Sequence, residues 1–111
     1  METDPALRER LLTFVVAGGN FAGIEVSSHI LTSFRKLART HYSGIDPDEI
    51  NVVVVHNGDR ILPELDRKQP GVVDYAENYL EDIGLDIRWN TKLEAATPEE
   101  AVLGTGERIP T

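Results

Sequence analysis

Two short apolar runs in the chain predict β-strands that are buried on both faces. Residues 11–16 are all apolar or β-branched and stop at a pair of glycines. Residues 51–56 contain four consecutive valines and end at His56. Continuous apolar character over so short a length, without alternation, is typical of strands in a parallel sheet that is covered on both sides.

Between these runs the apolar residues change to helical spacing. Four of them recur at intervals of four, four and three residues, which predicts one face of a helix of about five turns. The positions expected to face the core are Val26, Ile30, Phe34 and Leu37, with Ala22 and Ala38 at the ends of the same face. The polar residues of the same stretch fall largely on the other faces, as for Glu25 and Arg35.

A second helix is expected over about residues 68–83, with Pro70 in its first turn and Gly84 as its C-terminal cap. Its inward positions are Val73, Ala76, Leu80 and Ile83. A third, short strand follows at residues 85–88. The next residue, Trp89, is expected to fill or border the core rather than to stack on a ligand.

The two ends of the chain are made of shorter segments. Residues 3–10 predict a short helix, with Asp4 as its cap and Pro5 at its first position. Three segments near the C-terminus are separated by the turn-forming sequences PEE and GTG, and predict a small antiparallel meander.

The order strand, helix, strand, helix, strand and meander predicts an α/β fold. We expect one Rossmann-like three-layer domain over residues 1–111, with a three-stranded parallel sheet as its core, two helices and the antiparallel β-meander. Three strands make a narrow sheet, so a further strand is expected to be missing from it.

Composition and charge exclude several classes of function. The net charge is −8, from 19 acidic and 11 basic side chains, so the chain is not expected to bind nucleic acid. The absence of cysteine excludes a dithiol redox centre, an iron–sulfur cluster and a thiolate zinc site. The spacings of His29, His41 and His56 match no local pair of metal ligands, so we expect no metal site.

The turn after the first strand carries the chemical information. It lies between a strand and a helix, where a dinucleotide-binding fingerprint belongs. Gly18 suits the tight turn and Gly23 suits close packing of the helix on the strand, while the helix N-terminus offers N–H groups to a pyrophosphate. Asn20 stands where the fingerprint has its middle glycine. Because asparagine is also a good helix N-cap, the motif alone leaves two interpretations open: dinucleotide binding, or a well-capped α/β turn.

The end of the second strand is the other diagnostic position. An acid is usual there and accepts hydrogen bonds from both ribose hydroxyls, but this chain has His56, which makes a single such bond. Asn57 is the neighbouring candidate. Further on, Arg60 is suited to a 2′-phosphate, unless it and Asp59 only organise the turn.

Four blocks of sequence, in order, point to a family. They are LLTFVVAGGNFAGIE, VVVVHNGDRILPELD, YLEDIGLDIRWNT and AVLGTGERIPT. Over about residues 4–111 the chain resembles type II NADH dehydrogenases of the FAD-dependent pyridine nucleotide-disulfide oxidoreductase superfamily. In that family such a segment is the NADH-binding domain, inserted in an FAD-binding domain.

The resemblance implies a set of positions that bind the cofactor. They are Gly18, Gly19, Asn20, Phe21, Gly23, Glu25, His56 and Asn57. Gly18, Gly19, Asn20 and Gly23 match the pyrophosphate loop, Glu25 matches an acid near the nicotinamide and flavin, and His56 matches the ribose-binding acid. The family normally has glycine at position 20 and glutamate at position 56. The resemblance therefore implies NADH as the cofactor, with binding that is weak or absent in this chain by itself.

The expected function is that of one domain in a larger flavoprotein, an FAD-dependent NADH:quinone-type dehydrogenase. FAD is expected in the parent enzyme only, so the chain has no catalytic residues and no redox centre of its own, and is not active alone. The expected partners are NAD(H) and the FAD-binding domain of the same parent chain. The expected location is cytoplasmic. Contact with the inner face of the membrane is expected only through the parent enzyme.

Two alternatives stay open from the sequence. The first is a degenerate Rossmann module that has lost the cofactor and serves as a scaffold or interaction surface, which Asn20 and His56 favour. The second is an NADP-preferring nucleotide binder, which Arg60 and the missing acid favour.

Overall fold

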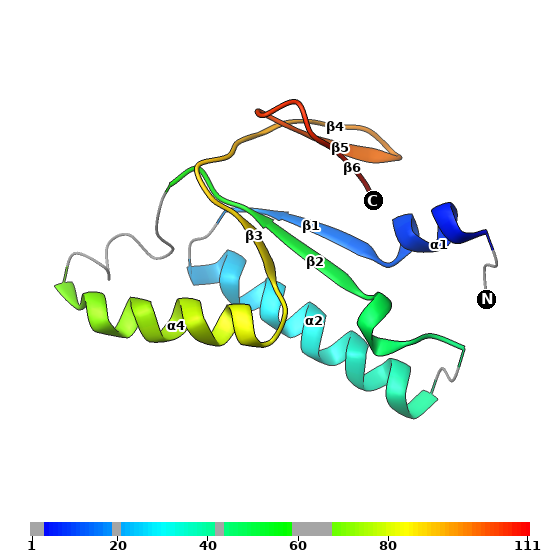
Figure 1. The fold of residues 1–111 in the computed structure, drawn as a ribbon, viewed down its shortest axis with the longest axis horizontal. Coiled ribbons are helices and arrows are strands. Elements are labelled where there is room, and N and C mark those ends of the chain that lie inside the picture. Colours follow the sequence, from blue (N-terminus) through cyan, green and yellow to red (C-terminus); the bar gives the residue numbers. More distant parts are fainter. Residues whose placement is uncertain (1–3, 19–20, 42–43, 59–67) are drawn as a thin grey trace.

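A computed structural model describes residues 4–18, 21–41, 44–58 and 68–111 of the chain. These residues form three layers, with two long helices below a parallel sheet and a small antiparallel sheet above it (Figure 1). The helices are α1 (Pro5–Leu11), α2 (Phe21–His41), the 3-10 turn η1 (Pro47–Glu49) and α4 (Pro70–Asp82). The strands are β1 (Thr13–Ala17), β2 (Asn51–Val55), β3 (Asp86–Arg88), β4 (Leu93–Ala96), β5 (Glu100–Leu103) and β6 (Arg108–Pro110). The expected fold class is confirmed.

The parallel sheet has the order β1-β2-β3, with Val15 opposite Val53 and Val55 opposite Arg88. Strand β2 lies in the middle, and all four of its valines are buried. Val52 and Val54 join the core on the helix side, while Val53 and Val55 join a second core under the antiparallel sheet. The prediction that β2 is buried on both faces is confirmed, and the further strand stays a prediction.

Helix α2 has the expected position, but its expected inward face is only partly right. Ile30 packs against the core and Ala38 is buried, as predicted, while the side chain of Ala22 lies outside the described parts. The other predicted positions are wrong, since Val26, Phe34 and Leu37 are 51%, 38% and 41% exposed. The rest of the row that faces the core consists of Ile24, Ser27 and Leu31.

The reason is the serine in the buried row. Ser27 is fully buried, and its hydroxyl donates a hydrogen bond of 2.6 Å to the carbonyl of Gly23, one helical turn earlier. A hydroxyl that is satisfied within its own helix is tolerated in the core. A small residue at this position also lets α2 approach the sheet closely. Because serine is not apolar, the spacing of the apolar residues predicted a neighbouring face of the helix.

Helix α4 confirms its prediction. Val73 and Leu80 are buried, and Ala76 and Ile83 pack against the same core. Gly84 follows the helix with a φ of 95°, in the left-handed region that favours glycine at this position. The guanidinium of Arg35 donates to the carbonyl of Ile83, which ties α2 to the end of α4. The N-terminal helix α1 is also confirmed, since the Asp4 carboxylate accepts from the backbone N–H of Ala6 at 3.0 Å.

The antiparallel meander forms the third layer, as predicted. Leu103 and Ile109 turn toward the parallel sheet and pack with Val53 and Val55. Arg88 joins the layers, because its guanidinium is paired with Asp86 on its own strand and with Glu107 before β6. Hydrogen bonds to Asp86 and Glu107 raise the pKa of Arg88 above its ordinary value, so these two carboxylates stabilise its charged form.

Two leucines in α2 test which face of the helix carries the packing. Leu31→Ala is expected to lower the free energy of unfolding by about 2–5 kcal/mol, because Leu31 is fully buried in the helix-side core. The matched change Leu37→Ala removes the same atoms from an exposed position and is expected to cost less than about 1 kcal/mol. Urea unfolding of both variants measures the difference. Equal losses, or a larger one for Leu37, would contradict this helix orientation.

Candidate functional site

The candidate site begins with the turn at the carboxyl end of β1. Gly18 has a φ of 108°, a conformation that favours glycine, so the sequence-based assignment of a tight turn to this residue is supported. Its N–H donates a hydrogen bond of 2.8 Å to the carbonyl of Val55, the last residue of β2. The turn is therefore held against the carboxyl end of the central strand. Two further predicted site residues, Gly19 and Asn20, lie outside the described residues.

The N-terminus of α2 follows this turn. The helix begins at Phe21, whose side chain is not among the described parts, and Glu25 lies exposed in its second turn. No acidic residue occupies the first turn, so the positive end of the helix dipole has no neutralising side chain there. The combination of a glycine turn and a positively polarised helix end suits an anion such as a pyrophosphate.

His56 lies directly after β2, beside this turn. Its N–H donates to the carbonyl of Arg88 at 3.0 Å, and its carbonyl accepts from the N–H of Thr91 at 2.9 Å. These bonds extend the pairing of β2 with β3 beyond the last strand residue. The N–H of Gly18 is bonded to Val55, the residue before His56. The two predicted site residues Gly18 and His56 therefore lie together at the carboxyl ends of the strands.

The loop after β2 leaves space for the imidazole ring of His56. Asn57 is exposed, and Gly58 accepts a hydrogen bond of 2.9 Å from the N–H of Asn90 in the loop after β3. A Cβ atom built on Gly58 would lie 2.9 Å from Nε2 of His56, so the glycine leaves space for the imidazole. Arg60, the residue suited to a 2′-phosphate, and its neighbour Asp59 fall outside the described part of the chain.

Trp89 also lies at this end of the sheet, although the sequence did not assign it to the site. It follows β3 directly, packs against the helix-side core as expected, and is only partly buried. Its ring also meets the ring of His56 edge-on, with a centroid distance of 6.3 Å and an interplanar angle of 80°. His56 and Trp89 each follow a strand by one residue, but their contact also depends on how β2 and β3 pair, which no local pattern in the sequence shows.

The hydrogen-bonding groups of this site can be compared with those that bind the phosphates and the ribose of a dinucleotide. Backbone N–H groups and a helix N-terminus are suited to its phosphates, so this half of the site fits. The position that the resemblance assigns to the ribose departs from the usual pattern, because it holds the imidazole of His56 in place of a carboxylate. Among the described residues no three side chains of histidine, aspartate or glutamate come together as metal ligands.

Comparison with known proteins decides the family. The profile of the pyridine nucleotide-disulphide oxidoreductase family matches residues 1–111. The chain belongs to this family. It is 28% identical over 103 residues to a probable NADH dehydrogenase of Dictyostelium discoideum, a match that covers 93% of this chain and 22% of that protein. It is 30% identical over 95 residues to a type II NADH:quinone oxidoreductase of Mycobacterium tuberculosis, covering 86% of this chain and 20% of that protein.

The chain thus spans about a fifth of the length of these relatives. Among solved structures it is similar to the NDH2 of Plasmodium falciparum in complex with NADH, with a TM-score of 0.85 and 14% identity. That match covers 97% of this chain and 22% of the other, and it shows the shared fold. None of the helices in the described residues has the length and apolar character that a membrane span requires.

A substitution at Gly58 tests the position of the His56 imidazole. Gly58→Ala is expected to turn the imidazole away from Trp89, because the new methyl group would approach Nε2 to 2.9 Å. The free energy of unfolding should change by less than about 1 kcal/mol, since only the end of a flexible side chain has to move. Trp89 is the single tryptophan of the chain, so its fluorescence reports the change.

The matched control is Gly44→Ala, where a Cβ atom would meet nothing within 4 Å. This variant should leave the tryptophan emission as it is in the unmodified chain. If Gly58→Ala behaved like Gly44→Ala, the imidazole would not occupy the place described here.

Proposed function

We propose that this chain is the NADH-binding domain of an FAD-dependent NADH:quinone-type dehydrogenase, and that it is not active alone. The observation that carries the proposal is the Gly18 turn, bonded to the end of β2 and followed by an α2 N-terminus without acidic residues. Family membership and the NADH dehydrogenase names of two similar proteins support it.

In this proposal the pyrophosphate lies at the N-terminus of α2. Gly18, Gly19, Asn20, Phe21 and Gly23 line it, and His56 with Asn57 lies beside the adenosine ribose. Glu25 lies toward the nicotinamide and the flavin. When bound, NADH supplies a hydride, and this chain supplies binding and orientation through its backbone and these side chains.

The partner in the proposal is the FAD-binding domain of the same parent chain, which holds the flavin. The chain spans only about a fifth of its relatives, a proportion that leaves room for such a domain. We place the parent enzyme in the cytoplasm, at the inner face of the membrane, where a quinone acceptor is found.

A second candidate function has one observation in its favour. His56 cannot offer the two acceptor oxygens of the usual carboxylate, and this favours a nucleotide-binding domain that prefers NADP, or a scaffold without the cofactor. Titration of the chain with nucleotides separates these functions from the proposed one.

Calorimetric titration with NADH is the direct test of the proposed function. We expect binding with a dissociation constant of about 100 μM or weaker. Each charge-assisted hydrogen bond that is lost costs roughly 1.5–3 kcal/mol, and ~1.4 kcal/mol is a factor of ten in affinity. A dissociation constant below about 10 μM would refute the weak binding. No binding at millimolar NADH would refute the proposed function and favour the scaffold.

A glutamate at position 56 should restore preference for NADH. In His56→Glu the carboxylate accepts from both ribose hydroxyls and repels a 2′-phosphate, so the ratio of the NADPH and NADH dissociation constants should rise about tenfold. His41→Glu is the control, because it adds the same charge at an exposed position at the far end of α2. An unchanged ratio in His56→Glu would mean that residue 56 does not face the ribose.

A further inference from the structure

His56 and Trp89 lie side by side on the helix-facing side of the parallel sheet. Val54 and Ile87 are opposite each other in the register of β2 and β3, and both pack into the helix-side core. Side chains two positions further along each strand point to the same face, which places His56 and Trp89 together just beyond the carboxyl ends. Their edge-on ring contact agrees with this placement.

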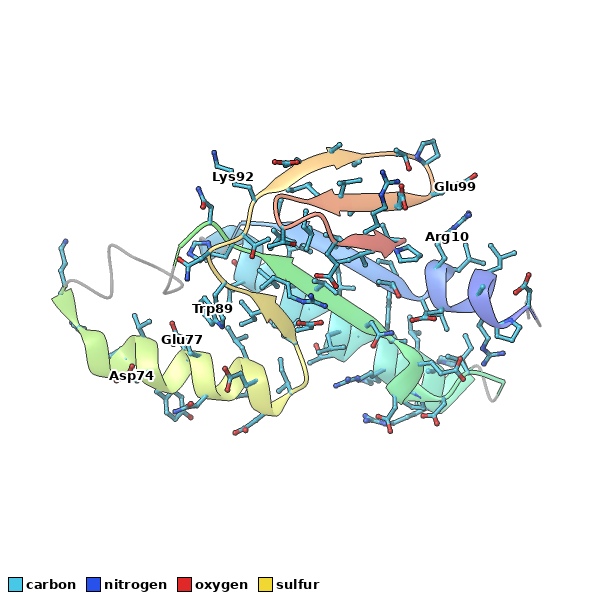
Figure 2. All side chains as sticks on the ribbon, turned by 45° about the horizontal axis from the view of Figure 1, so that its top comes forward. Arg10, Asp74, Glu77, Trp89, Lys92 and Glu99 are labelled. Carbon is cyan, nitrogen blue, oxygen red and sulfur yellow. The ribbon has the colours of Figure 1, made fainter. Side chains whose placement is uncertain are left out.

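Trp89 is partly buried and partly open. One part of the indole packs against the helix-side core, and another part meets the imidazole of His56. Figure 2 shows it at the end of β3, on the side of the sheet that faces α4. The core therefore holds the ring in place, and a planar group that approaches from beyond the strand ends finds an aromatic surface that is already ordered.

The three strand ends form a row. Gly18 and the N-terminus of α2 stand at the end of β1, His56 at the end of β2 and Trp89 at the end of β3. Neighbouring strands are ~4.8 Å apart, so the row extends over about 10 Å. In open α/β sheets, nucleotides bind outside the carboxyl ends of the strands. Phosphate, ribose and base of an adenosine would follow one another along such a row.

We propose that Trp89 forms one wall of the site for the adenine base, and that the His56–Trp89 pair recognises the adenosine end of the dinucleotide through aromatic contact. This inference rests on the proposed function. It adds to the proposed function the residue that contacts the adenine base, in a chain that lacks the usual carboxylate for the ribose. Contact with the flat face of a base does not depend on a group at the 2′ position.

The test uses ADP-ribose, which contains the adenosine and both phosphates but no nicotinamide. On the unmodified chain, saturating ADP-ribose should change the emission of Trp89, the single tryptophan. Calorimetry should show that Trp89→Leu weakens ADP-ribose binding about tenfold, as expected for loss of one aromatic contact to a base. Trp89→Phe should keep most of the affinity, and its circular dichroism should match that of the unmodified chain.

Two controls separate contact from a structural role. Tyr79→Leu removes an aromatic ring from an exposed position of α4 and should leave the ADP-ribose affinity unchanged. Nicotinamide mononucleotide has no adenine, so its affinity should be the same in Trp89→Leu and in the unmodified chain. An equal loss for both ligands in Trp89→Leu would mean that Trp89 only supports the fold, and would overturn the inference.

The remaining outcomes distinguish this inference from the proposed function. If ADP-ribose binds by calorimetry while the tryptophan emission stays constant and Trp89→Leu binds equally well, the base lies elsewhere. That result overturns the inference and leaves the proposed function standing. If neither NADH nor ADP-ribose binds the unmodified chain at millimolar concentration, both are overturned.

Discussion

Four valines of β2 point alternately to the two faces of the parallel sheet, and all four are buried. The other elements of the fold depend on this constraint. Val52 and Val54 point to one side and Val53 and Val55 to the other, and all four are at most 4% exposed. A strand of this kind needs an apolar layer on each face, because no alternate position can be left to water. Helices α2 and α4 provide one layer and the β-meander provides the other. The three-layer architecture follows from this sequence of residues 52–55.

The same strand also fixes the candidate site. Its last carbonyl, on Val55, accepts the N–H of Gly18, and the next residue, His56, is bonded through its backbone to Arg88 and Thr91. The carboxyl end of β2 therefore holds the loops that follow all three parallel strands. Backbone hydrogen bonds hold the described parts of these loops against the end of β2.

Local patterns in the sequence were sufficient for much of this fold. Four valines in a row predicted β2, and Val73, Leu80 and Gly84 predicted α4 with its inward face and its end. The predicted face of α2 was partly wrong because Ser27 is buried with its hydroxyl bonded inside the helix, and a periodicity of apolar side chains does not include serine. The contact of His56 with Trp89 depends on the register between β2 and β3, which joins residues 33 positions apart and has no local signal.

The two halves of the proposed site would respond differently to changes in sequence, because they depend on different parts of the chain. In the proposal, the phosphates meet backbone N–H groups and a helix dipole, and these persist as long as Gly18 and α2 keep their places on β2. The proposed contact with the ribose depends on the side chain of residue 56 alone, so a chain with His56 can keep the family fold while this contact changes. Substitution at position 56 is therefore expected to act on nucleotide affinity and preference. Substitution of Gly18, whose φ of 108° excludes most other residues, acts on the turn itself, and so is expected to act on all the proposed phosphate contacts.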